Sequence, residues 1–240
     1  FHGNQAAVMV LQRWPDDSLL QSIAKENNYS ETAYLVPKDT PADWELRWFT
    51  PGVEIELCGH ATLAAAWVLY NKGFVPPETP EVRLKTRLRG TLVVSKAEGG
   101  FLSMSFPRLK SVKATLPDYL RPLFDPNDII DVVQDSTGPG NGGDFMVVLR
   151  SPEAVQKFAT DDKLVAQLPM RGLTITAAYP KPKEYCLRGF FPAVGISEDP
   201  VTGSAHCLAA PYWHEKWALG PYHQSAAYQI CPSRSGSMKC

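Results

Sequence analysis

A thiol, a glycine and an imidazole stand side by side at Cys58, Gly59 and His60, immediately before a run of helix-forming residues that continues to Tyr70. Thiol and imidazole side chains serve as nucleophiles, acids and bases near neutral pH. A helix that begins near Gly59 leaves its first N–H groups unpaired, and these groups attract an anion together with the helix dipole. The stretch therefore predicts a binding site for an anion such as a substrate carboxylate.

A second stretch of the same kind lies near the other end of the chain. Leu46–Pro51 (LRWFTP) resembles Leu187–Pro192 (LRGFFP). After a spacer that is three residues longer in the second copy, Cys58–Ala61 corresponds to Thr202–Ala205, and each opens a helix rich in alanine and leucine. Two likenesses in the same order predict a duplicated strand–loop–helix unit, and hence two domains.

We expect the two domains to span residues 1–110 and 111–240. The segment from Pro107 to about Pro126 mixes charge with proline and shows little periodicity, as a domain boundary does. A pseudo-twofold axis relating the two units would bring two helix N-termini toward a shared cleft. Such a cleft would bind anions and is the usual place for a small-molecule site.

The side chains that could act on a ligand in such a cleft are Glu31, His60, Asp199 and Ser204. Glu31 lies at the joint between a predicted helix over residues 16–27, with Asp16 as its N-cap, and a predicted strand over residues 29–36. Taken alone, Glu31 is more simply interpreted as a solvated loop carboxylate. Asp199 and Ser204 are, by the same standard, more simply interpreted as caps of the second helix.

Other segments show the periodicity of strands or helices. We expect further strands at residues 6–11, 44–49, 144–149, 173–179 and 185–191, a hairpin formed by 82–94 and 101–106, a helix over 151–160 with a short one reaching 168, and a helix to about 218 that Pro211 kinks or splits. The glycine-rich segment 137–143 lacks the spacing of a phosphate loop, and we expect it to be a surface loop.

Composition excludes several classes of function. Of the 240 residues, 44% are hydrophobic, and the 24 basic and 25 acidic residues nearly cancel without forming blocks. This balance does not favour binding to nucleic acid or to an anionic membrane. No apolar run reaches the roughly 18 residues that span a bilayer, and the start does not resemble a signal peptide. We expect a soluble, cytoplasmic protein that acts on a small molecule.

Metal and disulfide motifs are absent from the sequence. The five cysteines include no C-x-x-C pair, and the histidines are scattered without an H-x-x-x-H or H-E-x-x-H motif. We therefore expect reduced thiols, no metal and no cofactor. We assign no role to the histidines on the predicted second helix and beyond it, His206, His214 and His223.

Three motifs together resemble the PhzF-like, or phenazine biosynthesis-like, isomerase family. These motifs are Ser30–Ala33 (SETA), Leu57–Ala66 (LCGHATLAAA) and Glu198–Cys207 (EDPVTGSAHC). The opening FHGNQAAV is similar to the start of family members, except that Gln5 stands where the family has proline. We expect the family's first strand and closing strands to lie outside this sequence.

The resemblance implies an α/β (α+β) fold like that of diaminopimelate epimerase, with two pseudo-twofold-related domains, each a curved, mostly antiparallel sheet around a central helix. It implies a cofactor-independent isomerase in which Glu31 moves a proton between carbons of a carboxylate-bearing metabolite, while His60 and Asp199 position the substrate. The residues that it implies in substrate binding are Gly59, Ala61, Gly203, Ser204 and Ala205. Because family members are commonly dimers, a homodimer is expected.

The wider superfamily includes racemases that use two opposed cysteines, at the positions of Cys58 and Thr202. Here Thr202 replaces the second thiol, and a hydroxyl is a poor base. Both residues remain possible members of the site, although Cys58 is more simply interpreted as a packed thiol. Two alternative functions stay open: an epimerase or dehydratase of an amino-acid or proline-like substrate, and a binding or scaffold protein without turnover.

Overall fold

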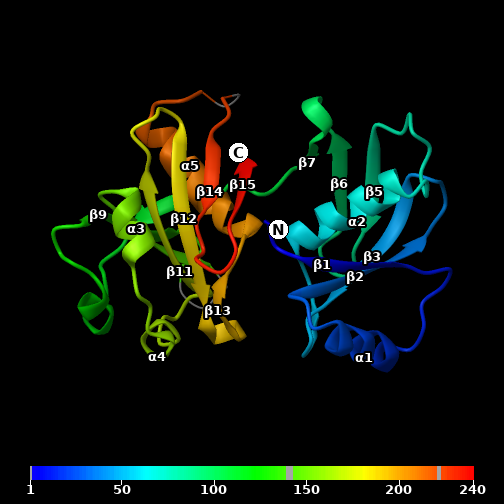
Figure 1. The fold of residues 1–240 in the computed structure, drawn as a ribbon, viewed down its shortest axis with the longest axis horizontal. Helices are drawn as coiled ribbons and strands as arrows, with labels where there is room; N and C mark the ends of the chain where they lie inside the picture. Colours follow the sequence, from blue (N-terminus) through cyan, green and yellow to red (C-terminus); the bar gives the residue numbers. More distant parts are fainter. Residues whose placement is uncertain (1, 139–142, 221–222) are drawn as a thin grey trace. The chain divides into compact units, whose positions relative to one another are not determined.

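The computed structural model describes residues 2–138, 143–220 and 223–240 (Figure 1). The chain divides into two compact units. The first unit is Gln5–Phe106, and the second is Pro107–Cys240 together with the residues up to Asn4. Within the described ranges, every helix is too short or too polar to span a bilayer.

The Gln5–Phe106 unit is built on a seven-stranded sheet with the order β1-β2-β3-β5-β6-β7, in which β4 pairs with β3. Its strands are β1 (Ala6–Val10), β2 (Glu31–Pro37), β3 (Asp43–Phe49), β4 (Glu54–Ile55), β5 (Glu81–Lys85), β6 (Thr91–Lys96) and β7 (Leu102–Met104). Its helices are α1 (Asp17–Asn27), α2 (Gly59–Asn71) and the 3-10 turn η1 (Glu98–Gly100).

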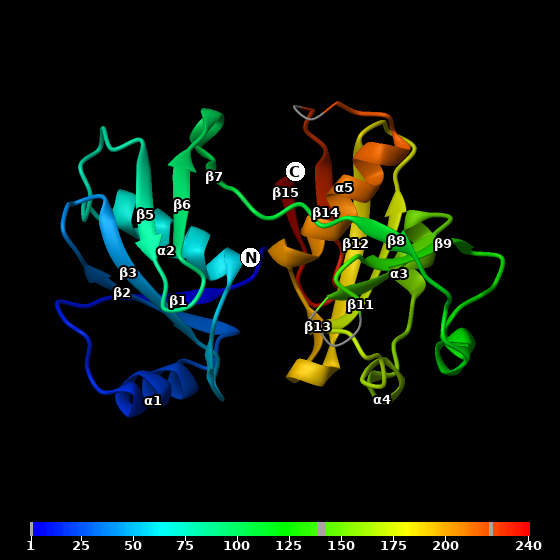
Figure 2. The same ribbon diagram turned by 180° about the vertical axis from the view of Figure 1, so that it is seen from behind.

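Helices α1 and α2 cover opposite faces of this sheet, because neighbouring residues of a strand point to opposite faces. Ala33 and Leu35 of β2 pack in the apolar cluster under α2. Tyr34, which lies between them, packs with Leu20 of α1 and donates a 2.7 Å hydrogen bond to the Leu20 carbonyl. Figure 2 shows α1 and α2 from the reverse side.

The second unit is built on an eight-stranded sheet with the order β15-β14-β12-β11-β10-β9-β8, in which β13 pairs with β12. Its strands are β8 (Ser111–Lys113), β9 (Ile129–Asp135), β10 (Asp144–Leu149), β11 (Gly172–Ala178), β12 (Glu184–Phe191), β13 (Ile196–Asp199), β14 (Ala226–Gln229) and β15 (Gly236–Lys239). Its helical segments are α3 (Pro152–Lys157), α4 (Asp162–Val165), α5 (His206–Lys216), η2 (Asp118–Leu123), η3 (Pro192–Val194) and η4 (Gly203–Ala205).

Strand pairing confirms the predicted duplication. In the first unit, β1 and β2 are parallel, β2 and β3 antiparallel, β3 and β5 parallel, and β5 and β6 antiparallel. In the second unit, β10, β11, β12, β14 and β15 repeat this series in the same order. In each series, a short strand pairs antiparallel with the third member: β4 with β3, and β13 with β12. A helix follows each short strand, α2 after β4 and α5 after β13.

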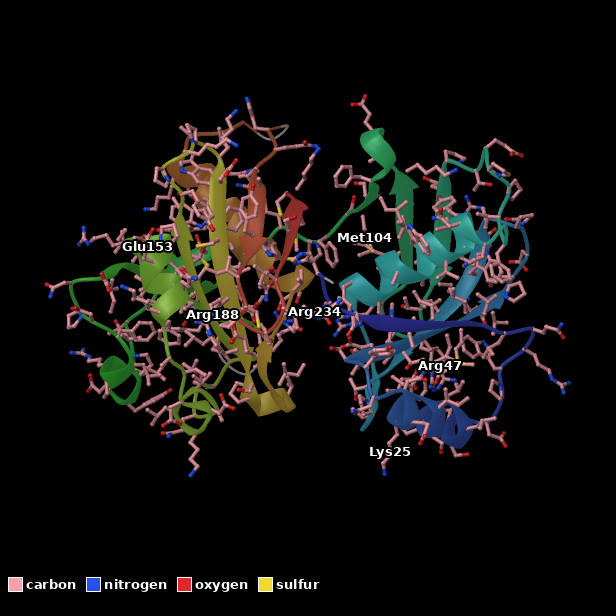
Figure 3. The ribbon with its side chains drawn as sticks, in the orientation of Figure 1. Lys25, Arg47, Met104, Glu153, Arg188 and Arg234 are labelled. Atoms are coloured by element: carbon pink, nitrogen blue, oxygen red, sulfur yellow. The ribbon has the colours of Figure 1, made fainter. Side chains whose placement is uncertain are left out.

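A buried arginine occupies the same place in each copy, and Figure 3 labels both. Arg47 on β3 donates from Nε and Nη2 to the two carboxylate oxygens of Glu54 on β4, at 2.7 and 2.8 Å. Arg188 on β12 does the same to Glu198 on β13, at 2.6 and 2.8 Å. Two parallel charge-assisted bonds fix both distance and orientation, so each pair holds the short strand that precedes the helix.

Pro211 lies inside α5 without ending it. Proline lacks an N–H group, so the Cys207 carbonyl, four residues earlier, has no helical donor. The N–H of Leu109 donates to that carbonyl at 3.0 Å. An external donor therefore satisfies the carbonyl that the proline leaves unpaired, and the helix continues to Lys216.

Hydrogen bonds tie the residues that follow Pro107 to the second unit. Leu109 is tied to α5, and the Lys110 carbonyl accepts from Ser136 of the second unit. At the other end, Asn4 donates to the Asp199 carboxylate at 2.6 Å, so the residues up to Asn4 belong to the second unit.

Several local predictions were wrong in detail. Residues 82–94 form two strands instead of one, because the chain turns at Thr86, whose N–H donates to the Gly90 carbonyl at 2.8 Å. The segment 107–126 contains β8 and η2. Asp16 precedes α1 but forms no side-chain cap hydrogen bond. Of the predicted loop 137–143, residues 139–142 lie outside the described residues.

His206, the first residue of α5, is a buried structural histidine. Only 5% of its surface is exposed, and its Nδ1 lies 2.7 Å from the Tyr185 hydroxyl. Burial lowers the pKa of His206 to about 4, because the charged imidazolium would lose its hydration. The folded protein therefore keeps this imidazole neutral throughout the neutral pH range.

We predict that His206 contributes to acid sensitivity. Its pKa rises from about 4 when folded to the ordinary 6.5 when unfolded, so the unfolded chain binds the proton first as pH falls from 6.5 to 4. The free energy of unfolding should fall in this window by on the order of 3 kcal/mol. Urea unfolding at pH 7 and pH 4.5 measures this fall in the free energy of unfolding. The fall should be smaller in His206→Gln than in wild type, and it should be unchanged in His2→Gln, a control at an exposed histidine. Equal pH dependence in wild type and the His206 variant would contradict the assignment.

Candidate active site

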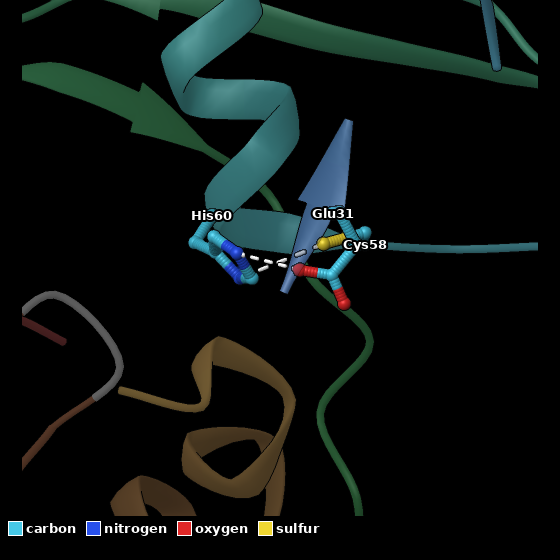
Figure 4. A group of neighbouring side chains, drawn as sticks. All are labelled: Glu31, Cys58 and His60. Carbon is cyan, nitrogen blue, oxygen red and sulfur yellow. Dashed lines mark hydrogen bonds and ion pairs between the residues drawn. The ribbon is translucent and has the colours of Figure 1, made fainter. Parts of the chain in front are cut away.

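The start of β2 and the start of α2 bring a carboxylate and an imidazole together. Glu31 is the first residue of β2, where it lies opposite Ala6 of β1, and only 6% of its surface is exposed. Its Oε2 lies 2.8 Å from Nε2 of His60, the second residue of α2 (Figure 4). The interpretation of Glu31 as a solvated loop carboxylate is therefore wrong.

This contact is close but is not aligned as a hydrogen bond. Glu31 Oε2 and His60 Nε2 are both buried, and neither has a hydrogen-bond partner of acceptable geometry among the described residues. Buried polar atoms without an aligned partner are unusual and call for an explanation. A ligand that inserts a polar group beside these two atoms would satisfy them.

Cys58 is the third side chain of a compact group, and possible ligand atoms of Glu31, Cys58 and His60 all lie within 4.8 Å of one another. Its Sγ lies 3.5 Å from His60 Nδ1, as Figure 4 shows, and it also belongs to the apolar cluster under α2. Burial raises the pKa of the Cys58 thiol, although the neighbouring His60 acts in the opposite direction. Cys58 is thus a packed thiol, as the simpler interpretation held, that also contacts the imidazole.

The charge state of His60 follows from its neighbours. Burial on its own lowers the pKa of the imidazole, but Cys58 and Glu31 outweigh burial and raise the pKa to about 10. At neutral pH, the carboxylate therefore faces an imidazolium. An imidazolium beside the first turn of α2 favours a bound anion, because both the cation and the helix dipole attract negative charge.

Small residues are required at the start of α2. A Cβ atom on Gly59 would lie 2.6 Å from Cζ of Phe106, too close for a carbon–carbon contact. Ala61 is fully buried. The helix begins at Gly59, as predicted, and the first N–H groups of a helix have no partner within it. The role of Gly59 and Ala61 in substrate binding stays a prediction.

Asp199, the last residue of β13, is held by three segments of the second unit. Its carboxylate accepts hydrogen bonds from Thr202 Oγ1 at 2.5 Å and from Asn4 Nδ2 at 2.6 Å. The Gln229 amide donates to the Asp199 carbonyl and accepts from the Thr202 N–H at 2.6 Å. Because the Thr202 hydroxyl proton is directed at Asp199, Thr202 does not replace the second base of a racemase.

Ser204 lies in η4, the turn formed by Gly203, Ser204 and Ala205 immediately before α5. Its Oγ accepts a 2.7 Å hydrogen bond from Nη1 of Arg171. Thr202 and Ala205 occupy the cap positions of η4 and α5, and neither forms a side-chain cap hydrogen bond. The interpretation of Asp199 and Ser204 as helix caps is therefore wrong.

No role was predicted from the sequence for four residues of this network, because each lies far from its partner along the chain. They are Asn4, Asp144, Arg171 and Gln229. The predicted site residues thus form two clusters in separate units. Glu31, Cys58 and His60 are together in one, and the residues from Asp199 to Ser204 are in the other.

Metal binding must be considered for the first cluster. Among the described residues, Glu31, Cys58 and His60 form a group whose possible ligand atoms lie within 4.8 Å of one another. No spacing motif indicated this group. The thiol faces Nδ1 of the imidazole and the carboxylate faces Nε2. The group is compact enough to hold a cation, and it also gives each nitrogen of the imidazole a neighbour with which a proton could be exchanged.

Comparisons with known proteins agree with this architecture. A family model described as "Phenazine biosynthesis-like protein" matches residues 1–240. An uncharacterized isomerase of Pseudomonas aeruginosa is 41% identical over 240 residues, which cover 100% of this chain and 85% of that protein. A PhzF-family phenazine biosynthesis protein of Enterococcus faecalis has a TM-score of 0.87 at 34% identity, covering 100% of this chain and 85% of that one.

A more distant structure supports the fold alone. A predicted epimerase of Pseudomonas aeruginosa has a TM-score of 0.70 at 21% identity, covering 99% of this chain and 86% of that one. The expected epimerase-like fold of two α/β units is confirmed.

The imidazolium can be tested by following the titration of His60 by NMR. In the wild type its pKa should lie well above 6.5, and Glu31→Gln should lower it, because the carboxylate that faces Nε2 is removed. Glu45→Gln is the matched control, since Glu45 is a partly buried carboxylate of the same sheet that binds Trp14 at 2.6 Å. A wild-type pKa at or below 6.5, or equal shifts in both variants, would refute this electrostatic description.

Proposed function

The chain belongs to the phenazine biosynthesis-like protein family and is an isomerase, and we propose that it moves a proton between two carbons of a small carboxylate-bearing metabolite by general acid/base catalysis. One observation carries this proposal. A buried carboxylate, Glu31, contacts an imidazolium, His60, and the described residues offer neither of the contacting atoms an aligned hydrogen-bond partner. The pair combines a base with a cationic donor, and both are held by regular structure.

In the proposed reaction, the Glu31 carboxylate removes a proton from one carbon of the substrate. The electron pair of the broken C–H bond moves into a new double bond, and the double bond already present shifts. Glu31 then returns the proton to a second carbon, which restores the carboxylate. The step is redox neutral and uses one base on one face of the substrate, so it requires no external oxidant or reductant.

His60 supports this chemistry by donating to the substrate. The imidazolium and the first turn of α2 stabilise negative charge that develops on a substrate oxygen when the proton leaves. A positioned hydrogen-bond donor is worth more when it points at charge that appears only in the transition state. We assign to Asp199 the binding of a substrate amine or hydroxyl, and to Ser204 the binding of its carboxylate.

An epimerase is the second candidate, because Cys58 offers a thiol beside the same imidazole. Epimerisation by two bases needs a donor and an acceptor on opposite faces of the carbon. The residue that corresponds to Cys58 in the second copy is Thr202, whose hydroxyl is hydrogen-bonded to Asp199. This bond favours the isomerase over the two-base epimerase.

Incubation of small aromatic and amino-acid carboxylates in D₂O tests the proposal. We expect deuterium at a carbon from which a double bond has moved, because the proton held by Glu31 exchanges with solvent. Glu31→Gln should lower turnover by at least ~10²-fold, the usual contribution of a positioned base. Glu45→Gln, again the matched control, should retain turnover.

The remaining outcomes separate the alternatives. Deuterium at a stereocentre with inversion and no moved double bond would support epimerisation. Tight binding of a carboxylate without any exchange would support a binding protein. Undiminished turnover in the Glu31 variant would eliminate Glu31 as the base.

A further inference from the structure

The two copies of the duplicated unit differ at the positions that surround the helix start. In the first copy, the register pairs Ala6 of β1 with Glu31 of β2. In the second copy, the same register pairs Asp144 of β10 with Gly172 of β11. The first copy thus carries its carboxylate on the second strand of the pair, at Glu31. The second copy carries it on the first strand of the pair, at Asp144.

Gly172 cannot be replaced by a residue with a side chain unless its surroundings move. A Cβ atom there would lie 2.3 Å from the Phe190 carbonyl oxygen and 2.3 Å from the Phe191 ring. The place that Glu31 occupies in the first copy is thus closed in the second. The preceding residue, Arg171, supplies the group that contacts the helix start instead.

The contacts at the helix start accordingly have opposite charge in the two copies. His60, the second residue of α2, faces a carboxylate at 2.8 Å. Ser204, which corresponds to His60 in the repeat, faces the Arg171 guanidinium at 2.7 Å. One copy provides a base, and the other provides a cation-bound hydroxyl.

Arg171 is held rigidly in this position. Its Nε and Nη2 donate to the two oxygens of Asp144 at 2.8 and 2.5 Å, and its guanidinium lies 4.9 Å from the centre of the Phe191 ring. Asp144 is 2% exposed. A two-point contact with a buried carboxylate together with stacking on an aromatic ring leaves the guanidinium little freedom.

The bond from Arg171 fixes what Ser204 can do. A hydroxyl that accepts from a guanidinium must direct its own proton elsewhere, because an arginine nitrogen cannot accept. In the part of the chain that the structure describes, the Ser204 Oγ has no second hydrogen-bond partner. Ser204 therefore directs its proton away from Arg171, and a carboxylate oxygen is a strong acceptor for such a donor.

We propose that Arg171 is a positioning residue that orients the Ser204 hydroxyl as a donor to the carboxylate of the ligand. The inference rests on the proposed function only in that the ligand carries a carboxylate. Asp144 neutralises the guanidinium, so Arg171 acts through Ser204 rather than as a free charge. The guanidinium also polarises the hydroxyl that it binds, which strengthens the bond that the hydroxyl donates.

The test compares two probes that differ only in the carboxylate, 3-hydroxyanthranilate and 2-aminophenol, by isothermal titration calorimetry. Wild type should bind the carboxylate probe at least ~10-fold more tightly, as one charge-assisted hydrogen bond allows. Ser204→Ala and Arg171→Gln should each reduce the ratio of the two dissociation constants to about one. The variant that combines Ser204→Ala with Arg171→Gln should reduce this ratio no further. Arg171→Lys should restore little of the preference, because lysine cannot bind both Asp144 oxygens and Ser204 at once.

Control variants separate positioning from folding. Arg83→Gln removes an arginine–aspartate pair of the same kind, Arg83 with Asp43 at 2.7 and 3.1 Å, and should leave the preference intact. Asp144→Asn combined with Arg171→Gln removes the buried carboxylate that Arg171→Gln alone would leave unpaired. This double variant should fold and still lack the preference. Loss of affinity for both probes in equal proportion would indicate a structural role and overturn the proposal.

Two further outcomes decide the question. A carboxylate preference that persists in Arg171→Gln, or a wild type without any preference, would each overturn the positioning role. The measurement needs no turnover and can be repeated in Glu31→Gln. A failed deuterium assay with a preference that depends on Arg171 would therefore refute the isomerase mechanism and leave the positioning role standing.

Discussion

A buried arginine bound to both oxygens of a glutamate fixes the approach to the helix start in each unit. Arg47 binds Glu54, and Arg188 binds Glu198. Removing one partner of such a pair is destabilising, because a buried guanidinium loses the carboxylate that binds it at two points. The spacer between the repeated motifs is three residues longer in the second copy, yet the pair is the same. The ion pair, rather than the length of the loop, therefore determines where each helix begins.

The two copies of the duplicated unit differ in the charge of the group that contacts the start of the helix. The first copy keeps a carboxylate beside an imidazolium, an arrangement suited to moving a proton. In the second copy, Gly172 closes the corresponding place and Arg171 directs a hydroxyl. One scaffold thus carries a carboxylate–imidazole pair in one copy and an arginine-bound hydroxyl in the other. The paired residues at the start of the two parallel strands differ, Ala6 with Glu31 in one copy and Asp144 with Gly172 in the other.

The sequence predicted the duplication, the helix at Gly59 and the candidate residues, because these depend on local periodicity and on short motifs. It could not predict partners that are far apart in the chain. Arg171 meets Ser204 across 33 positions and Asn4 meets Asp199 across 195. Taken alone, Glu31 was interpreted as a solvated loop carboxylate, because a position at a helix–strand joint does not reveal burial. Proline in α5 was expected to disturb the helix, whereas Leu109 supplies the missing donor.

The first residues of the sequence complete the second unit. Asn4 donates to the Asp199 carboxylate, and the neighbouring Gly3 is hydrogen-bonded to Ser235 and Arg234. The Gln5–Phe106 unit is thus an insertion within a unit assembled from both ends of this chain. A truncated chain that begins at β1 would keep every strand of the first unit. It would lose Asn4, which donates a hydrogen bond to Asp199 of the second unit.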